Sequence, residues 1–235
     1  MVLTFNDQLR QRVRTNGPDP LITYYDLTTG ERTELSAISF VNWVNKTAHL
    51  LEYECEIDEE NTVTVRLARS APGHWVTLVW HAAIWAIGAT SSPRSRLAEL
   101  FVVGPDQVTS PLIGQGETVA CSLHPLGLGF SVPLPDGVMD YGLEVRSQPD
   151  SNGIRDVYEE TLAWVDGDFD VDHAALVQNT TPSPERRLIR PDDPWLTVQS
   201  ALIAPVLGGG SSVIVVGDAT PDQLERIVSS ERVTA

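Results

Sequence analysis

Residues 195–234 read WLTVQSALIAPVLGGGSSVIVVGDATPDQLERIVSSERVT, and this stretch predicts a helix, a glycine turn, a strand and a second helix. In its first part, apolar residues recur close to the helical period of 3.6 residues. Gly208, Gly209 and Gly210 follow, where the end of a helix favours a positive φ. Residues 211–216 are rich in β-branched side chains, which suits a buried parallel strand. Thr220 and Pro221 then mark the N-cap and first turn of the last helix. This order is half of a wound α/β unit.

The chain before this stretch alternates between helix and strand patterns in the same way. The run 74–88 is apolar nearly all round, which is typical of a helix buried between layers. The predicted elements are a surface helix at 4–14, a hairpin of strands 21–27 and 32–35, a helix capped by Ser36, a strand at 62–67, the buried helix at 74–88, a short strand that stops at Pro93, and a short helix followed by a strand within 96–103.

The composition limits the class of function. The 235 residues include 32 Asp and Glu but 16 Lys and Arg, and the resulting net charge of −16 argues against binding a nucleic-acid backbone. Cys55 and Cys121 lie far apart without the spacing of a zinc site, so we expect two free buried thiols and no metal. The N-terminus has no apolar signal segment, and the apolar run 75–88 is too short to span a bilayer. We therefore expect a cytoplasmic protein that does not bind membranes.

Three segments resemble the adenylate-forming, AMP-binding enzymes of the acyl-CoA synthetase superfamily. Residues 19–51, DPLITYYDLTTGERTELSAISFVNWVNKTAHLL, and 60–90, ENTVTVRLARSAPGHWVTLVWHAAIWAIGAT, are similar to the opening of those enzymes. Residues 202–234 are similar to the part that follows their phosphate loop. Residues 123–150, LHPLGLGFSVPLPDGVMDYGLEVRSQPD, more specifically resemble a group of short actinobacterial proteins that share only the N-terminal part of this fold. The resemblance implies a truncated acyl-CoA synthetase-like domain, because the superfamily's later motifs would lie beyond Ala235.

The phosphate loop of that superfamily has no counterpart here. Residues 161–178 read TLAWVDGDFDVDHAALVQ, in which 162–165 resembles the strand before the loop and Val171, His173 and Leu176 resemble the helix after it. Only residues 166–170, DGDFD, stand between them. A phosphate cradle needs glycine backbone N–H groups, hydroxyls and a cation. This segment has one glycine and three carboxylates, so we expect the usual mode of ATP binding to be lost.

The same segment offers weak candidate sites. Asp166, Asp168 and Asp170 alternate, but they do not fit the spacing of an EF-hand calcium loop, and a hairpin turn is the preferred interpretation. Asp172 beside His173 could form a general base, yet no nucleophile accompanies them. We therefore predict no catalytic residue and no metal ligand.

Asp140, Tyr141, Glu144 and Arg146 are the most individual polar group in the chain. Such a density of polar side chains either lines a cleft or joins two lobes through salt bridges, and the sequence leaves both open. As candidate cleft residues we take these four together with Asp166, Asp168 and His173.

The sequence thus predicts a three-layer αβα fold of two wound lobes, like the N-terminal domain of acyl-CoA synthetases but truncated and without the phosphate loop. The first lobe covers 1–150, with a β-rich segment at 113–150, and a smaller lobe covers 151–235. We expect a non-catalytic AMP-binding-like domain retained for binding a small ligand or a protein, without a cofactor. The alternative is an enzyme with divergent acyl or nucleotide chemistry between the lobes. An exposed sheet edge in the second lobe would favour a homodimer.

Overall fold

The computed structural model describes residues 3–109 and 116–235. Its first half contains α1 (Phe5–Asn16), β1 (Pro20–Asp26), β2 (Glu31–Ser36), α2 (Ala37–Tyr53), β3 (Thr62–Val65), α3 (Leu67–Ser70), α4 (Trp75–Ala86), β4 (Thr90–Ser92), β5 (Leu100–Val103) and β6 (Glu117–Ala120). Its second half contains β7 (Val138–Asp140), α5 (Tyr141–Glu144), a 3₁₀ turn (Val145–Ser147), β8 (Leu162–Asp166), β9 (Phe169–Asp172), α6 (His173–Gln178), β10 (Arg186–Ile189), α7 (Pro194–Val198), a π-helical turn (Gln199–Ile203), α8 (Ala204–Gly208), β11 (Ser211–Val216) and α9 (Pro221–Ser230).

The strands form two sheets. The smaller sheet has the order β10-β11-β1-β2, in which β1 pairs in parallel with β11 and antiparallel with β2. The larger sheet has the order β7-β6-β5-β3-β4-β8-β9 and is parallel except for β9. Each sheet contains strands from both sides of residue 150, and the division of the chain into two lobes there stays a prediction.

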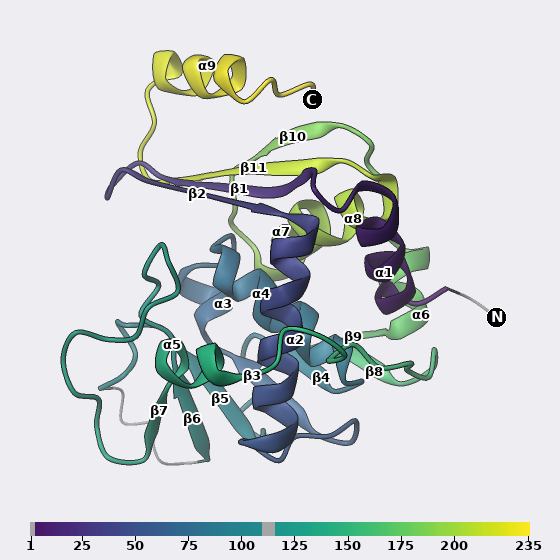
Figure 1. The fold of residues 1–235 in the computed structure, drawn as a ribbon, viewed down its shortest axis with the longest axis vertical. Coiled ribbons are helices and arrows are strands. Elements are labelled where there is room, and N and C mark those ends of the chain that lie inside the picture. Colours follow the sequence, from purple (N-terminus) through teal and green to yellow (C-terminus); the bar gives the residue numbers. More distant parts are fainter. Residues whose placement is uncertain (1–2, 110–115) are drawn as a thin grey trace.

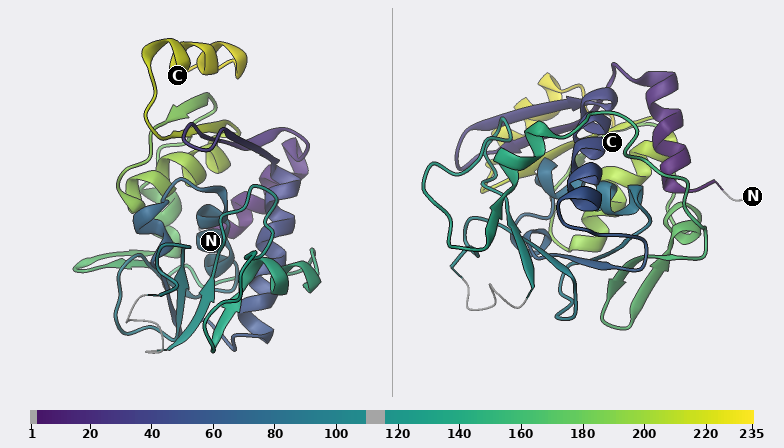
Figure 2. Two further views of the ribbon diagram at one scale, coloured as in Figure 1. Left: turned by 90° about the vertical axis from the view of Figure 1, so that its left-hand side faces the viewer. Right: turned by 60° about the horizontal axis from the view of Figure 1, so that its bottom comes forward.

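Helices fill the space between the two sheets (Figure 1). All twelve residues of α4 are buried there, as the apolar run predicted, and α2 packs against α4. α9 lies on the outer side of the smaller sheet, where Ile227 packs against Val213 and Val215 of β11. The layers are therefore α9, the smaller sheet, the central helices and the larger sheet, with the β8–β9 hairpin projecting from its side (Figure 2).

Residues 195–234 fold as predicted, with one irregularity. Gly209 has a φ of 80° at the end of α8, and Thr220 caps α9 through a reciprocal pair with Gln223. The helix before the glycines widens into a π turn just ahead of Pro205, which has no N–H to offer the carbonyl of Ala201. The hydroxyl of Ser212 on β11 donates to that carbonyl instead, at 2.8 Å.

The short helix predicted within 96–103 is wrong, whereas the strand is present as β5. The hydroxyl oxygen of Ser92 accepts the backbone N–H groups of Arg94 and Ser95, which holds the chain in a turn. The hydroxyl of Thr64 on β3 then donates to the carbonyl of Ser95 at 3.2 Å. Residues 93–99 are in this way tied to the sheet instead of coiling into a helix.

Candidate functional site

The carboxyl edge of the larger sheet is the natural place for a site. β3, β4, β5, β6, β7 and β8 all run in parallel, so their carboxyl ends meet along one edge. Ligands of open α/β sheets bind in crevices at that edge. The candidate residues Asp140 and Asp166 are the last residues of β7 and β8 and therefore both lie there.

β8 turns directly into β9. The two strands pair antiparallel with Asp166 opposite Phe169, so that Gly167 and Asp168 form a two-residue hairpin loop. Gly167 has a φ of +66°, the left-handed conformation that such a loop requires. The predicted hairpin turn is confirmed, and it stands where the resemblance places the phosphate loop.

A hollow of about 510 Å³ opens beside this hairpin. The guanidinium of Arg94 makes a two-pronged ion pair with the carboxylate of Asp166 across it. The Asp166 side chain is 11% exposed and that of Arg94 is 55% exposed, so the pair joins a mostly buried carboxylate to a cation that faces solvent. The hollow is lined by Ser92, Arg94, Ser95, Val165, Asp166 and Gly167.

Aromatic side chains of the hairpin pack against Trp195. Trp164 of β8 is fully buried, and its ring lies 5.3 Å from that of Trp195, which in turn meets Phe169 edge-on at 5.4 Å. On its other side Trp164 contacts His81, whose Nδ1 hydrogen-bonds the Ser91 hydroxyl at 2.7 Å. Burial lowers the pKa of His81 to about 3, so this imidazole is neutral at physiological pH and serves packing.

The candidate residues at β7 have structural roles. Asp140 caps α5, because its carboxylate accepts the N–H groups of Gly142 and Phe130 at 2.9 and 2.8 Å. Tyr141 is 2% exposed, and its hydroxyl hydrogen-bonds that of Thr47 in the core at 2.7 Å.

The remaining candidates do not join these residues in one cleft. Glu144 and Arg146 are exposed. β7 and β8 are separated in the sheet by β6, β5, β3 and β4, so Asp140 and Asp166 lie far apart along the edge. Asp168 is exposed at the hairpin tip, and His173 is completely buried at the start of α6, where burial lowers its pKa to about 4. Only Asp166 of the seven therefore lines the hollow beside the hairpin.

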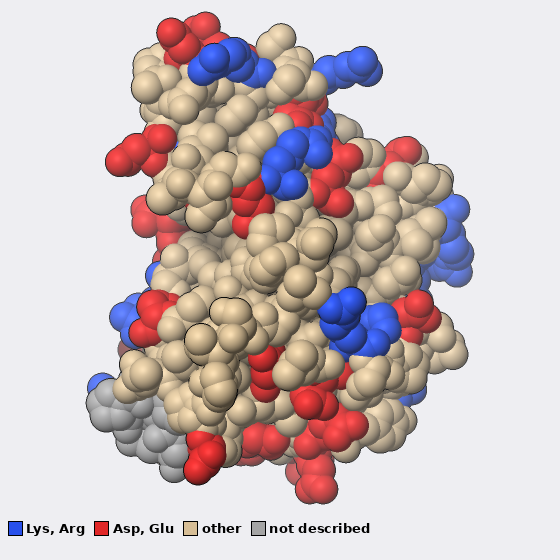
Figure 3. Space-filling view, turned by 60° about the vertical axis from the view of Figure 1, so that its left-hand side comes forward, with Lys and Arg blue, Asp and Glu red and all other residues tan. Residues whose placement is uncertain are grey.

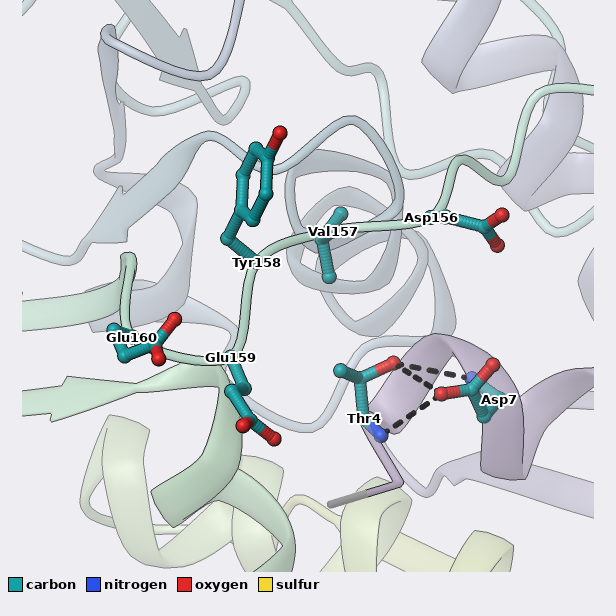
Figure 4. Close-up of a pocket in the computed structure, with 7 residues that line it drawn as sticks. All are labelled: Thr4, Asp7, Asp156, Val157, Tyr158, Glu159 and Glu160. Atoms are coloured by element: carbon teal, nitrogen blue, oxygen red, sulfur yellow. Dashed lines mark hydrogen bonds between the residues drawn. The ribbon is translucent and has the colours of Figure 1, made fainter. Parts of the chain in front are cut away.

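A second hollow, of about 550 Å³, lies between the start of α1 and residues 156–160 (Figure 4). Two of the residues drawn there, Thr4 and Asp7, bond reciprocally as the capping box of α1. Arg10 pairs with Asp7 at 3.3 Å and with Asp156 at 2.8 Å, so it neutralises two of the acidic side chains that line this hollow. Within residues 3–109 and 116–235, no group of three or more His, Cys, Asp or Glu side chains is arranged to hold a metal ion. In the same ranges no helix is long and apolar enough to cross a bilayer.

Comparison with solved structures defines the class of fold. The chain is similar to an acyl-CoA synthetase of Brucella canis, with a TM-score of 0.79 and 14% identity over 100% of this chain and 47% of that one. It is also similar to an anthranilate CoA ligase in complex with anthranoyl-AMP, with a TM-score of 0.72 and 14% identity over 99% of this chain and 49% of that one. A mutant form of coronafacic acid ligase from Pectobacterium brasiliense gives a TM-score of 0.67 at 12% identity, over 98% of this chain and 48% of that one.

The chain thus has the fold of the N-terminal domain of acyl-CoA synthetase-like ligases and spans about half of their length. No family model matches it. Over 242 residues it is 31% identical to a TIGR03089 family protein of Mycobacterium tuberculosis, and the match covers 94% of this chain and 93% of that relative. The chain belongs to this family, and the predicted resemblance to a short family with a partial AMP-binding fold is confirmed.

Proposed function

We propose that this protein is a non-catalytic domain that keeps the fold of an AMP-binding ligase and uses it to bind a small ligand or a protein partner. The observation that supports this most is the hairpin of Gly167 and Asp168, with Asp166 held by Arg94, at the place of the phosphate loop. The comparisons support the fold, and the binding role is our inference from this site.

The hairpin is a poor place for a triphosphate. The backbone groups of β8 and β9 bond to each other in the ladder, so they are not free to cradle phosphate oxygens. Asp166 is paired with Arg94, but Asp168 and Asp170 leave the hairpin with a net negative charge, which repels a polyphosphate. The cation that lines the hollow, Arg94, is already neutralised by Asp166.

The alternative function is an enzyme with divergent acyl or nucleotide chemistry. Its general base would be Asp172 with His173. Asp172, however, caps α6, because its carboxylate accepts the N–H of Ala175 at 2.6 Å. His173 is 0% exposed, so its ring has no access to a substrate in solution. The capping role of Asp172 and the burial of His173 favour the binding role over the enzymatic one.

The test is isotope exchange between pyrophosphate and ATP in the presence of Mg²⁺ and a panel of aliphatic and aromatic carboxylic acids. We expect exchange no faster than in a sample without protein. Carboxylate-dependent exchange that an Asp166→Ala/Arg94→Ala double variant abolishes would contradict the proposal. Exchange that persists in this variant and follows the protein through a second, independent purification would contradict the proposal as well.

The homodimer stays a prediction, but the structure changes which edge could form it. Residues 233–235 continue beyond α9 along the outer edge of β10. The N–H of Thr234 donates to the carbonyl of Arg186 at 2.8 Å, and the N–H of Leu188 donates to the carbonyl of Ala235 at 3.1 Å. These bonds occupy the edge of β10, so a partner strand would add to β2, β7 or β9.

A further inference from the structure

Three arginines, Arg66, Arg69 and Arg96, follow the carboxyl ends of the neighbouring strands β3 and β4. Thr64 of β3 lies opposite Phe101 of β5 in the ladder, so both side chains point to the same face. Arg66 follows two residues after Thr64, and its guanidinium lies 4.3 Å from the centroid of the Phe101 ring. Residues 93–99 cross the same region, because the carbonyl of Ser95 accepts the hydroxyl of Thr64. Arg96 directly follows this anchored residue, and α3 carries Arg69 three residues after Arg66.

The three positive charges repel one another. Burial lowers the pKa of Arg66, and the charges of Arg69 and Arg96 lower it further. Among residues 3–109 and 116–235, no carboxylate lies within 4.0 Å of any of the three guanidinium groups. Asp106, which lies beside Gly104 on the turn after β5, makes no such pair either. Residues 1–2 and 110–115 contain no Asp or Glu, so the missing counter-charge is not hidden there.

Such a cluster is unusual for this chain, because acidic side chains outnumber basic ones 32 to 16. On the face shown in Figure 3, most basic side chains lie next to acidic ones, and acidic side chains gather at the lower end. Outside this cluster, five arginines form ion pairs with carboxylates, namely Arg10, Arg32, Arg94, Arg155 and Arg186. An unpaired cluster costs stability through self-repulsion unless a ligand supplies the negative charge.

We propose that Arg66, Arg69 and Arg96 bind a small anion with at least two negative charges, namely the phosphate group of a phosphate ester or pyrophosphate. Guanidinium groups present forks of N–H donors that match phosphate oxygens, and stacking on Phe101 fixes the orientation of one fork in advance. The hollow beside the β8–β9 hairpin is lined in part by Ser92 and Ser95, and Ser95 directly precedes Arg96. This hollow offers room for the organic part of an ester. This inference rests on the proposed binding role and names the class of ligand.

The first test compares the thermal stability of the wild-type protein in pyrophosphate and in sodium chloride of equal ionic strength. We expect pyrophosphate to raise the melting temperature beyond the effect of the salt, because it binds only the folded state. In the double variant Arg69→Gln/Arg96→Gln, we expect pyrophosphate binding measured by calorimetry to weaken about tenfold or more, in line with the loss of charge-assisted hydrogen bonds.

The matched control is Arg187→Gln/Arg226→Gln, which removes the same charge from two exposed arginines on β10 and α9. It should keep the full response to pyrophosphate. An equal response to sodium chloride, an unchanged response in Arg69→Gln/Arg96→Gln, or a lost response in the control would each overturn the site.

The melting temperature without ligand distinguishes a binding role of these arginines from a structural role. Without ligand, Arg69→Gln/Arg96→Gln should melt at the same temperature as the wild type or above it, because the repulsion on Arg66 is relieved. A lower melting temperature would mean that the arginines support the fold, which contradicts the proposal. If pyrophosphate does not bind, the arginine site is wrong but the proposed non-catalytic role is untouched. The exchange assay alone tests that role.

Discussion

Alanine at position 208 should lower the free energy of unfolding by about 3 kcal/mol, the upper part of the range for overpacking a close-packed site. A Cβ at Gly208 would lie 2.3 Å from both the backbone carbon and the carbonyl oxygen of Ser183. Because these are backbone atoms, no side-chain rotation can relieve the contact. The neighbouring chain is also bonded there, since the N–H of Gly210 donates to the carbonyl of Ser183 at 3.1 Å. The substitution must therefore push the segment leading into β10 away from the turn between α8 and β11.

The matched control for this prediction is Gly209→Ala, one residue along. A Cβ at Gly209 meets nothing within 4 Å, but its φ of +80° is strained for any residue with a side chain. We expect a loss of about 1 kcal/mol, the usual cost of a left-handed L-residue. Equilibrium denaturation in urea measures both losses. If the two variants lost the same stability, the close approach of Ser183 would not be what requires glycine at 208.

These glycines show what the sequence could and could not reveal. The pattern of a helix followed by glycines predicts one residue with a positive φ, and Gly209 confirms it. Gly208 has another cause, the approach of Ser183, which lies 25 residues earlier in the chain. Contacts of this kind depend on the order of the strands in the sheet, which local sequence patterns do not predict. For the same reason the pairing of β1 with β11, near opposite ends of the chain, could not be predicted.

The candidate cleft residues illustrate a second limit. Tyr141 looked like part of a polar group, but its ring packs against Trp80 in the core and only its hydroxyl needs a partner. Asp140 looked like a ligand-binding carboxylate, but it caps a helix. The arginine cluster was missed for the opposite reason. Arg66 and Arg96 belong to separate segments, which are brought together by long-range contacts such as the bond from Thr64 to Ser95.

Glu231 should make the stability of the fold depend on pH, because it lies at the centre of the contacts that hold α9 to the smaller sheet. Its carboxylate accepts hydrogen bonds from Arg186 at 2.6 Å, from Arg32 at 3.0 Å and from the hydroxyl of Tyr25. Burial alone would raise the pKa of Glu231, but the hydrogen bonds from Arg32, Tyr25 and Arg186 outweigh it and lower the pKa to about 2. The side chain is 8% exposed, so solvent screens these contacts little.

A folded-state pKa below the ordinary value of 4.5 means that the ionised carboxylate is bound more tightly in the folded chain than in the unfolded one. Its contribution is therefore complete above about pH 4.5 and is lost as the pH falls towards 2. At pH 7, Glu231→Gln should cost about 3 kcal/mol, following the conversion of 1.36 kcal/mol for each pKa unit. Glu225→Gln on the exposed face of α9 removes the same charge and should cost less than about 0.5 kcal/mol.

Urea denaturation of both variants and the wild type between about pH 2 and 7 measures these differences. The gap between the wild type and Glu231→Gln should close as the pH falls, while the gap for Glu225→Gln stays small throughout. A gap for Glu231→Gln that persisted unchanged below pH 3 would show that the substitution acts through packing and not through the charge. Closure of the gap would instead identify the ion pairs of Glu231 with Arg32 and Arg186 as a main contact that fixes α9 on the sheet, since Ile227 is the one fully buried apolar side chain of that helix and Leu224 beside it is only partly buried.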